Sequence, residues 1–414
     1  MIMAMMKDTG VPWIGQIPAD WELGKVKYAF DRKKEKSTEK DPTVLSLARA
    51  GVKIRDISTN EGQLAASYEG YNPVEPNDLL LNPMDLVSGA NCSISKVSGV
   101  ISPAYVNLRA KIGFEPRYYD YYFKTQYWNM GLFAHGKGVS FENRWTLNDA
   151  TLRDYYIPMP RLSEQQIIAD YLDEEGSKID DIIAEANASV EEYKELKQAV
   201  IDKYILGFNN IHIKLRQLGS LKNGLNFSHS DEFPNTKFLG VGCFKDNLVL
   251  NDVKDFSDEH INFDIPDEYL LINGDIVFVR SNGSKELVGR SVMVDNIDYP
   301  LTFSGFCIRF RNERTELVDN RFLLYYFRTT HFKQSLLKYS NDSTNINNLN
   351  QEMLNAIRVN APIVDKQRVL VKKLEHQIGK VDSLIAEKES LIKDLESYKK
   401  SLIYEVVTGK RKVV

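Results

Sequence analysis

The chain of 414 residues is poor in the side chains from which disulfides and metal sites are built. Its three cysteines, Cys92, Cys243 and Cys307, lie far apart and are odd in number. We expect reduced thiols in a cytoplasmic protein, because structural disulfides belong to oxidising compartments. The six histidines form no ligand pair with one another or with a cysteine, so we expect no metal site.

Long apolar runs are absent too. No stretch approaches the roughly 20 apolar residues that a membrane-spanning helix needs. The opening MIMAMM has no basic region before it, and Lys7 and Asp8 interrupt it, so it does not predict a signal peptide. With 43% hydrophobic and 27% charged residues, the composition is typical of a globular protein with two or three domains.

The net charge of −4 is small, but charge is unevenly distributed along the chain. Residues 161–207 carry 5 basic and 12 acidic side chains, whereas residues 363–414 carry 12 basic and 8 acidic ones. Both segments have a helical pattern of apolar residues. Their opposite net charges predict that the two helices pack on each other.

An internal repeat spans the chain. Residues 160–207 match residues 362–409 with eleven identities at a constant offset of 202. The similarity continues upstream, where YYFKT at 121–125 matches YYFRT at 325–329 at an offset of 204, and LNDATL at 147–152 matches LNQEML at 349–354 at an offset of 202. Asp78 and Asp275 each open an apolar, strand-like run. We infer two copies of one unit, each a globular part followed by a long helix.

The fold class that we expect is α+β. Two similar domains, each a mixed β-sheet with short helices, are joined by two long antiparallel coiled-coil helices with pseudo-two-fold symmetry. The expected boundaries are 1–160 and 208–362 for the domains, and 161–207 and 363–414 for the helices. Segments 44–54, 78–82 and 105–114 predict strands in the first domain, and 237–242, 274–281 and 306–311 in the second. The aromatic segments 118–128 and 322–332 predict short helices whose rings belong to the core.

Each long helix has apolar residues at the spacing of a coiled-coil seam. The expected seam residues are Leu172, Ile179, Ile183, Val190, Tyr193 and Val200 in the first helix, and Leu374, Val381, Leu384, Leu391, Leu395 and Leu402 in the second. We expect Ser163 and Asp365 at the helix N-termini, with Gly207 and Gly409 as stops. A 44-residue helix of roughly 65 Å with one apolar stripe needs a partner. Pairing with each other is favoured by charge, and a foreign partner for each helix is the alternative.

Two motifs that suggest catalysis fail on inspection. GLFAHGKGVS at 131–140 has the spacing of a nucleotide-binding loop, but Gly138 stands where that loop needs Ser or Thr for magnesium. The preceding YWNM reads as a helix end rather than a strand, and the second copy has no counterpart. NPMD at 82–85 begins like an amino-methyltransferase motif, but it lacks the aromatic residue that stacks a flipped base.

Four stretches resemble type I restriction–modification specificity subunits. GVPWIGQIPADWELGKVK at 10–27 is similar to the opening of these proteins, and IPMPRLSEQQIIADYLD at 157–173 to the start of their first spacer helix. LKQAVIDKYILG and YKKSLIYEVVTGK resemble the ends of their two spacer helices. The resemblance covers essentially the whole chain, with one departure at Lys366, where the family pattern has glutamate.

The resemblance implies a DNA-recognition subunit that is not itself an enzyme. Each globular part would be a target-recognition domain that binds one half of a split, asymmetric site in double-stranded DNA. The helix pair would set the spacing and bind modification (methyltransferase) subunits, two in number, and ATP-dependent restriction subunits would join them. S-adenosylmethionine and ATP would bind to those partners, and this chain would need no cofactor.

Candidate DNA-binding residues lie in polar or basic stretches between the predicted elements. They are His135, Lys137, Asn143 and Arg144 in one loop; Arg49, Lys53 and Arg55; Arg280, Ser281, Asn282, Ser284, Lys285 and Arg290; and Asn341, Thr344 and Asn345. Amides suit adenine edges, and most lysines and arginines at such interfaces contact phosphate. Each stretch can also be read as an ordinary solvated loop.

A second function remains open from the sequence. A coiled-coil adaptor whose globular ends bind protein partners would show the same repeat and the same helices. A free-standing methyltransferase or ATPase is disfavoured, because the motifs for both are incomplete.

Overall fold

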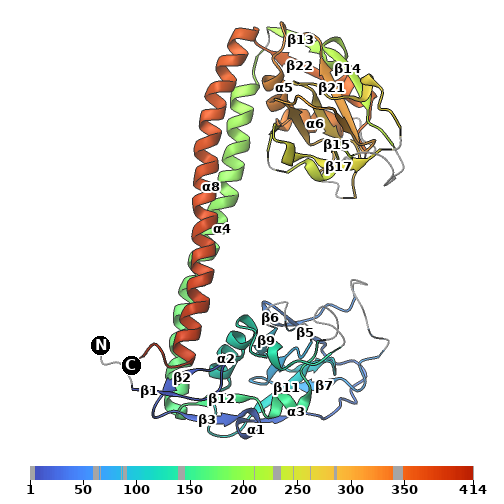
Figure 1. Cartoon of the computed structure of the whole chain (residues 1–414). Helices are drawn as coiled ribbons and strands as arrows, with labels where there is room; N and C mark the ends of the chain where they lie inside the picture. Colours follow the sequence, from blue (N-terminus) through green and yellow to red (C-terminus); the bar gives the residue numbers. More distant parts are fainter. Residues whose placement is uncertain are drawn as a thin grey trace. The chain divides into compact units, whose positions relative to one another are not determined.

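The computed structural model describes residues 5–413 except 59–64, 66, 85, 87–90, 139–144, 209, 227–234, 246, 262, 284–286 and 339–347. The chain forms two compact units: unit 1 is Met1–Ala186 with Ser390–Val414, and unit 2 is Asn187–Glu389. Each unit contains a domain of sheets and short helices and parts of two long helices, α4 (Leu162–Ile205) and α8 (Val364–Val407) (Figure 1). The predicted fold class, two similar α+β domains carried on two long helices, is confirmed.

The central sheet of unit 1 is antiparallel, with the strand order β4-β11-β8-β9. Helix α2 packs against β9 and buries four tyrosines and a phenylalanine. The elements of this domain are β1 (Met6–Asp8), β2 (Gln16–Pro18), β3 (Glu22–Lys25), α1 (Val26–Ala29), β4 (Phe30–Arg32), β5 (Leu45–Ala48), β6 (Gly51–Ile54), β7 (Asn72–Val74), β8 (Leu79–Leu81), β9 (Cys92–Ile94), β10 (Gly99–Ile101), β11 (Val106–Ala110), α2 (Pro116–Trp128), η1 (Phe133–His135), α3 (Asp149–Arg153) and β12 (Tyr156–Met159).

Unit 2 repeats this arrangement and extends it. Its main sheet has the order β14-β21-β18-β19-β16, and a second sheet has the order β17-β15-β20. The elements are β13 (Ile211–Lys214), η2 (Leu215–Gln217), β14 (Gly219–Asn223), β15 (Asn235–Leu239), η3 (Val241–Cys243), β16 (Val249–Leu250), η4 (Val253–Asp255), β17 (Ser257–His260), η5 (Asp267–Tyr269), β18 (Ile276–Val279), β19 (Ser291–Val294), β20 (Leu301–Phe303), β21 (Cys307–Asn312), α5 (Asn320–Tyr326), α6 (Thr330–Leu337), α7 (Gln351–Ala356) and β22 (Arg358–Ala361).

Three local features differ from the sequence prediction. Segment 44–54 is a hairpin of β5 and β6 rather than one strand, with Gly51 at a positive φ of 111° next to the turn. The aromatic helix of unit 2 is broken into α5 and α6, because the Thr329 hydroxyl caps a new helix by accepting a hydrogen bond from Phe332 N. Helices α4 and α8 begin one residue before Ser163 and Asp365, which therefore lie inside the first turn.

A continuous heptad seam runs along both long helices. In α8 the buried or half-buried residues alternate in spacing between three and four, from Val371 and Leu374 through Ile385, Lys388 and Ile392 to Leu402. Leu384 and Leu391, which we had predicted in the seam, are 41% and 40% exposed and precede the seam residues Ile385 and Ile392. Leu384 and Ile385 are adjacent apolar residues, as are Leu391 and Ile392, so the sequence alone does not show which of the two faces the partner helix.

The other predicted seam residues are all at least partly covered. Leu172, Ile179, Val190, Leu374, Val381 and Leu402 are buried, and Ile183, Tyr193, Val200 and Leu395 are half-buried.

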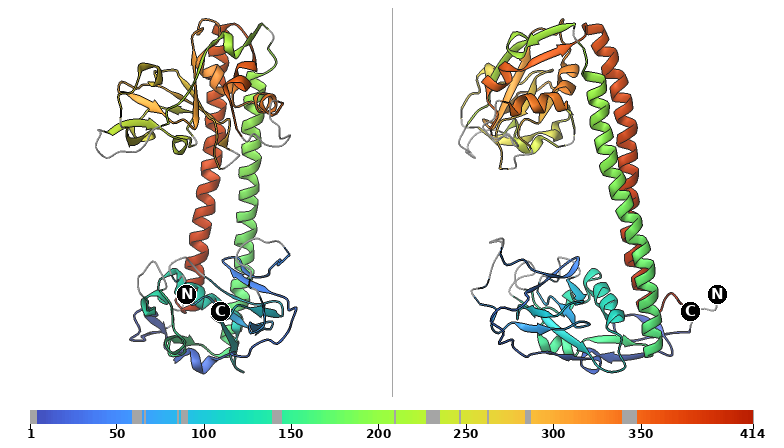
Figure 2. Two further views of the ribbon diagram at one scale, coloured as in Figure 1. Left: turned by 90° about the vertical axis from the view of Figure 1, so that its right-hand side faces the viewer. Right: turned by 180° about the vertical axis from the view of Figure 1, so that it is seen from behind.

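The helices run side by side and antiparallel within each unit (Figure 2). In unit 1 Lys399 Nζ donates to Asp180 Oδ1 at 2.6 Å, and in unit 2 Lys197 Nζ donates to Asp382 Oδ1 at 2.6 Å. The two lysines are 202 residues apart, and so are the two aspartates. The same interhelical ion pair therefore occurs once in each unit.

Each domain core includes residues of both helices. In unit 1 the buried side chains of Leu172 in α4 and of Leu402 and Val406 in α8 pack with Tyr118 and Tyr122 of α2. Tyr118 Oη also donates to the carbonyl of Val407 at 2.8 Å. A fully buried aliphatic side chain contributes about 1.5–3 kcal/mol. Unit 1 therefore depends on the C-terminal segment of the chain for part of its core.

A buried glutamine fastens each domain to the start of its helix. Gln165 Nε2 donates to Pro160 O at 2.7 Å, and its Oε1 accepts from Glu115 N, the N-cap residue of α2, at 2.8 Å. Gln367 bonds in the same way to Pro362 O and to the N-cap residue of α5, Asp319, at 2.7 and 2.8 Å. Each glutamine thus pairs an N–H at the start of a short helix, which that helix leaves unpaired, and a carbonyl just before the long helix.

An ion pair between a buried aspartate and a partly exposed arginine is also repeated. Asp78 accepts from Arg109 Nε at 2.7 Å, and Asp275 accepts from Arg311 Nε at 2.9 Å and from Arg311 Nη2 at 2.7 Å. The aspartates are 0% and 1% exposed. Because each also accepts a backbone N–H three residues upstream, from Glu75 or from Ile272, the pair fixes the turn that leads into β8 or β18.

We predict that Gln165→Leu destabilises unit 1 and that Gln367→Leu destabilises unit 2, each by about 2–5 kcal/mol. Gln165→Leu deletes two hydrogen bonds and Gln367→Leu deletes three, including one to Leu317 O. Each loss leaves a partly buried backbone group without a partner, at about 1–3 kcal/mol apiece. Amide hydrogen exchange of the full chain measures the two units separately. Gln166→Leu is the matched control, because Gln166 is exposed. A Gln165→Leu chain as stable as the Gln166→Leu chain would contradict the assignment.

Candidate nucleic-acid interface

The connections of unit 2 that carry candidate residues meet at one edge of the main sheet. Neighbouring strands β14, β21, β18 and β19 are antiparallel, so the C-terminal ends of β14 and β18 lie beside the N-terminal ends of β21 and β19. We call this the loop edge of unit 2 and define it as Gly224–Asn226, Arg280–Asn282, Arg290 and Ser304–Phe306. Arg280, Ser281, Asn282 and Arg290, predicted as one cluster, lie together at this edge because β18 and β19 pair antiparallel.

Backbone hydrogen bonds hold the loop edge of unit 2 in place. Gly305 N donates to Leu225 O at 2.7 Å, and Arg280 N donates to Phe306 O at 2.8 Å. The guanidinium groups are turned partly inward, since Arg290 Nη1 donates to Phe244 O at 3.3 Å and Arg280 Nη1 to Gly305 O at 3.4 Å. Both arginines remain half-exposed.

The polar loop between α6 and α7 returns to this same edge. Leu349 N donates to Arg280 O at 2.8 Å, which places the end of the loop beside Arg280. Its predicted residues Asn341, Thr344 and Asn345 lie outside the described residues, as do Ser284 and Lys285.

Unit 1 has the corresponding edge at the C-terminal ends of β4 and β8. Leu147 N donates to Pro83 O at 2.9 Å, which is the counterpart of the Leu349–Arg280 bond. The loop that precedes Leu147 carries Lys137, which is exposed and pairs through its backbone with Thr146 at 2.9 and 3.0 Å. Asn143 and Arg144 of this loop lie outside the described residues.

His135 has a packing role in this loop. Its ring contacts Trp13 and Tyr155 edge-on, with centroid distances of 4.2 and 5.3 Å, and its Nδ1 lies 2.9 Å from Gly131 O. Residues 131–138, the described part of the stretch that resembles a nucleotide-binding loop, thus contain a 3₁₀ turn, η1, that follows helix α2 and packs on Trp13 and Tyr155 through His135.

Lys34 is a basic residue near the loop edge of unit 1 that we did not single out from the sequence. Its neighbour Lys33 is only 10% exposed and pairs with Glu75 and Asp78 at the start of β8. Both lysines follow β4 directly, and the run RKKEK at 32–36 was the available signal. Lys34 Nζ lies 3.1 Å from Asp149, which Arg32 also contacts. Burial opposes ionisation of Asp149, but hydrogen bonds from Arg32 and Lys34 outweigh it and lower the pKa of this carboxyl.

The third predicted cluster lies elsewhere. Arg49, in the β5–β6 turn, lines an open groove of about 1420 Å³ with Asn77 and Lys96, which are at the opposite ends of β8 and β9. Lys53 is exposed on β6, and Arg55 follows β6 with its backbone bonded to Val44. Arg49 and Lys137 are therefore at opposite edges of the sheet of unit 1.

The groove itself has mixed charge. Its basic residues Arg49, Lys96, Lys124, Arg117, Lys399 and Lys400 are interspersed with the acids Asp120, Asp173, Asp180 and Glu396. Burial raises the pKa of Asp120, and Lys124, whose Nζ lies 2.7 Å from the carboxylate, opposes that rise. Paired charges of both signs make the groove a poorer phosphate channel than its lysine count indicates.

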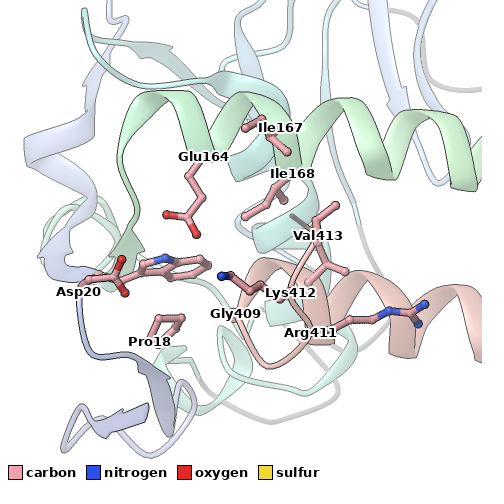
Figure 3. A pocket seen from close by; sticks show the side chains of 11 residues that line it. Pro18, Asp20, Glu164, Ile167, Ile168, Gly409, Arg411, Lys412 and Val413 are labelled. Carbon is pink, nitrogen blue, oxygen red and sulfur yellow. The ribbon is translucent and has the colours of Figure 1, made fainter. Parts of the chain in front are cut away.

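A smaller pocket lies in unit 1 where the N-terminal segment meets the C-terminal tail (Figure 3). It has a volume of about 140 Å³ and is lined by residues that include Trp21, Glu164, Ile167, Lys412 and Val413. Typical ligand sites measure roughly 300–1,000 Å³, so this pocket is too small for a nucleotide cofactor.

Within the described part of the chain, no three histidine, cysteine or acidic side chains gather as a metal site would require. The three cysteines are unpaired and buried, and burial raises the pKa of the Cys92 and Cys307 thiols. No helix among the described residues is long and apolar enough to cross a membrane.

Known proteins share both the sequence and the fold of this chain. The chain is 25% identical over 349 residues to the type I restriction enzyme StySPI specificity subunit of Salmonella potsdam, which covers 79% of this chain and 70% of that protein. It is 23% identical over 443 residues to the MjaVIII specificity subunit of Methanocaldococcus jannaschii, with coverage of 96% and 94%.

Two solved structures have a similar fold at low sequence identity. A chain from the structure described as "Structural basis underlying complex assembly and conformational transition of the type I R-M system" matches with a TM-score of 0.71 and 13% identity, over 95% of this chain and 99% of that chain. The HsdS subunit from Thermoanaerobacter tengcongensis matches with a TM-score of 0.51 and 12% identity, over 95% and 98%.

The family model for the type I restriction modification DNA specificity domain matches residues 104–192 and 212–394. The first match falls mainly in unit 1 and the second in unit 2. The resemblance predicted from the sequence is confirmed, and the chain belongs to the family of type I restriction–modification DNA specificity proteins.

Proposed function

We propose that each unit reads one half of a bipartite DNA site, and that the chain supplies sequence specificity to a type I restriction–modification complex. One observation carries this proposal: the same anchoring contacts occur in both units, while the loop edges carry different side chains. A common scaffold with two different loop edges suits an asymmetric site with two different halves.

The loop edges offer the donors that DNA recognition uses. Arg280, Arg290 and Asn282 in unit 2 offer positive charge and an amide, and Lys34 and Lys137 in unit 1 offer positive charge. Arginine pairs with guanine and asparagine with adenine in the major groove, while lysine contacts phosphate. Partner subunits would supply further phosphate contacts, which accounts for a net charge of only −4 on this chain.

We predict that Arg280→Ala weakens recognition of one half-site only, with a loss of roughly 5- to 150-fold in specific affinity. The other half-site should be read as before, because unit 1 is unchanged. The measurement is binding of the assembled complex to duplexes altered in one half-site at a time. Arg216→Ala is the control, because Arg216 is exposed near the start of β14, at the opposite edge of the sheet.

The two long helices would set the distance between the half-sites, because they are continuous between the two units. Their heptad seam keeps the pair in a single register. An insertion that preserves the heptad lengthens the pair without altering either loop edge.

We predict that one extra heptad in both helices lengthens the spacer by about three base pairs. Seven residues add about 10 Å of helix, and base pairs rise 3.4 Å each. The variant duplicates residues 180–186 after Ala186 and 383–389 after Glu389, and methylation mapping reads the site. The spacing proposal fails if the bases of a half-site change while the spacer stays constant.

A row of exposed apolar residues on each helix offers a binding surface for modification subunits. Ile182, Leu196, Leu384 and Tyr398 are 41–48% exposed and stand one position before a seam residue. Coiled-coil dimers normally carry glutamate or lysine there. The ion pairs bring Ile182 level with Tyr398 in unit 1 and Leu196 level with Leu384 in unit 2.

These pairs are again 202 residues apart, so each unit presents one matching pair. Apolar residues that flank a seam are what further helices pack against. We infer that each unit binds one modification subunit, giving two per chain, and that restriction subunits join this assembly.

We predict that Ile182→Lys with Tyr398→Lys lowers the count of bound modification subunits from two to one, and that adding Leu196→Lys with Leu384→Lys lowers it to none. Buried lysines would oppose the packing of partner helices, while the exposed positions leave the chain folded. Native mass spectrometry gives the count. Ile112→Lys, at a fully exposed loop position, should keep two. Retention of two by the fourfold variant would contradict this surface.

Catalysis and cofactors would belong to the partners. We place S-adenosylmethionine on the modification subunits and ATP on the restriction subunits, since both corresponding motifs in this chain are incomplete. We also place the complex in the cytoplasm, in keeping with three unpaired cysteines.

The test of the whole proposal is to co-express this chain with its modification subunit and map methylated adenines. Methylation confined to one bipartite sequence supports specificity. Uniform methylation, or a complex without DNA binding, would favour the alternative of a coiled-coil adaptor for protein partners.

A further inference from the structure

The turn before β21 in unit 2 has the same backbone as the turn before β11 in unit 1. Phe306 N donates to the Ser304 hydroxyl at 3.2 Å, and Ala104 N donates to the Ser102 hydroxyl at 3.3 Å. The closing backbone bonds also agree, from Cys307 N to Ser304 O at 2.8 Å and from Tyr105 N to Ser102 O at 3.0 Å. The two turns are 202 residues apart, in register with the repeat.

The turns differ in the side chain that they present. Phe306 is 60% exposed, although a phenylalanine gains from burial. Its counterpart Ala104 is also exposed, but it has no side chain beyond Cβ. The same scaffold position therefore carries a large apolar ring in unit 2 and a methyl group in unit 1.

Phe306 is held outward by its surroundings. Its carbonyl accepts from Arg280 N, and the preceding Gly305 N donates to Leu225 O. A Cβ at Gly305 would collide with the side chain of Asn226, and one at Gly224 with the carbonyls of Phe303 and Ser304. Phe303, just before the turn, and Cys307, just after it, are fully buried. The turn is therefore fixed at both ends and cannot move the Phe306 ring into the core.

The neighbours of Phe306 along the loop edge are polar. Arg280 is bonded to it, Ser281 and Asn282 follow directly, and Arg290 ends the same connection just before β19. An apolar ring among hydrogen-bond donors is the composition of a surface that reads bases, where phenylalanine contacts the thymine methyl group or enters between base pairs.

We propose that Phe306 is a specificity-determining residue of unit 2 that places its ring against the apolar surface of a base. Unit 1 makes no such contact, because Ala104 occupies the equivalent position. The inference rests on the proposed function, since it requires that the loop edge of unit 2 faces DNA.

The experiment uses the full chain in complex with its modification subunit and a duplex that contains the mapped site. Phe306→Ala should lower specific affinity by roughly 5- to 150-fold, the range for loss of an aromatic–base contact. Affinity for unrelated DNA and the melting temperature should not change, because the ring is exposed. Ile272→Ala is the matched control, as Ile272 is 49% exposed at the opposite end of β18.

Two substituted duplexes identify the base surface. Replacing thymines of the unit 2 half-site by uracil removes the methyl group and should reduce the Phe306→Ala effect if the ring contacts that methyl. A 2-aminopurine in place of an adenine that pairs with one of these thymines should brighten on binding of the unmodified chain, and not of Phe306→Ala, if the ring enters the stack. Loss of affinity with neither signal would overturn the base contact.

The outcomes separate this inference from the proposed function. If the unmodified complex prefers its site and Phe306→Ala binds equally well, the inference fails and the function stands. If the unmodified complex shows no site preference, the proposed function fails first. Ala104→Phe should disturb the unit 1 half-site alone, and an effect on both half-sites would also count against the inference.

Discussion

The pairing of α4 with α8 is the interaction on which both units depend. Each helix has one apolar stripe, and each domain core is completed by side chains of both helices, such as Leu172 and Leu402 in unit 1. The N-terminal domain therefore folds on the last turns of the chain, as the bond from Tyr118 to the Val407 carbonyl illustrates. A helix with exposed apolar residues would otherwise be marginal in water, because helical stability comes mostly from packing.

Buried polar contacts that occur in both units explain how a repeat with few sequence identities keeps one architecture. Gln165 and Gln367 satisfy the same backbone groups, and Asp78–Arg109 and Asp275–Arg311 fix the same turn. A buried polar group without a hydrogen-bond partner is costly, so a substitution of one residue in such a contact destabilises the protein unless its partner changes too. Apolar core positions tolerate exchange among side chains of similar size, and the loop edges tolerate a wider range of substitutions. The two units thus share a frame and differ where they would meet DNA.

The sequence predicted many residues of the candidate site, but only some of them lie together in the structure. Arg280, Asn282 and Arg290 came together at one edge because antiparallel strands return the chain to the same place. Arg49 moved to the opposite edge, since segment 44–54 folds as a hairpin. His135 looked available in the sequence and instead packs on Trp13. Lys34 was missed, because a short basic run after a strand has no distinguishing spacing.

The offset of 202, the heptad spacing and the family motifs were determined by the sequence alone, because each depends only on the order of residues along the chain. The sequence likewise paired Asp78 with Asp275. The arginine partner of each aspartate, the inward neighbour at Ile385 rather than Leu384, and the outward ring of Phe306 were decided by tertiary structure. Each of these depends on the register in which neighbouring strands or helices pack. A shift of that register by one residue exchanges a buried side chain for an exposed one.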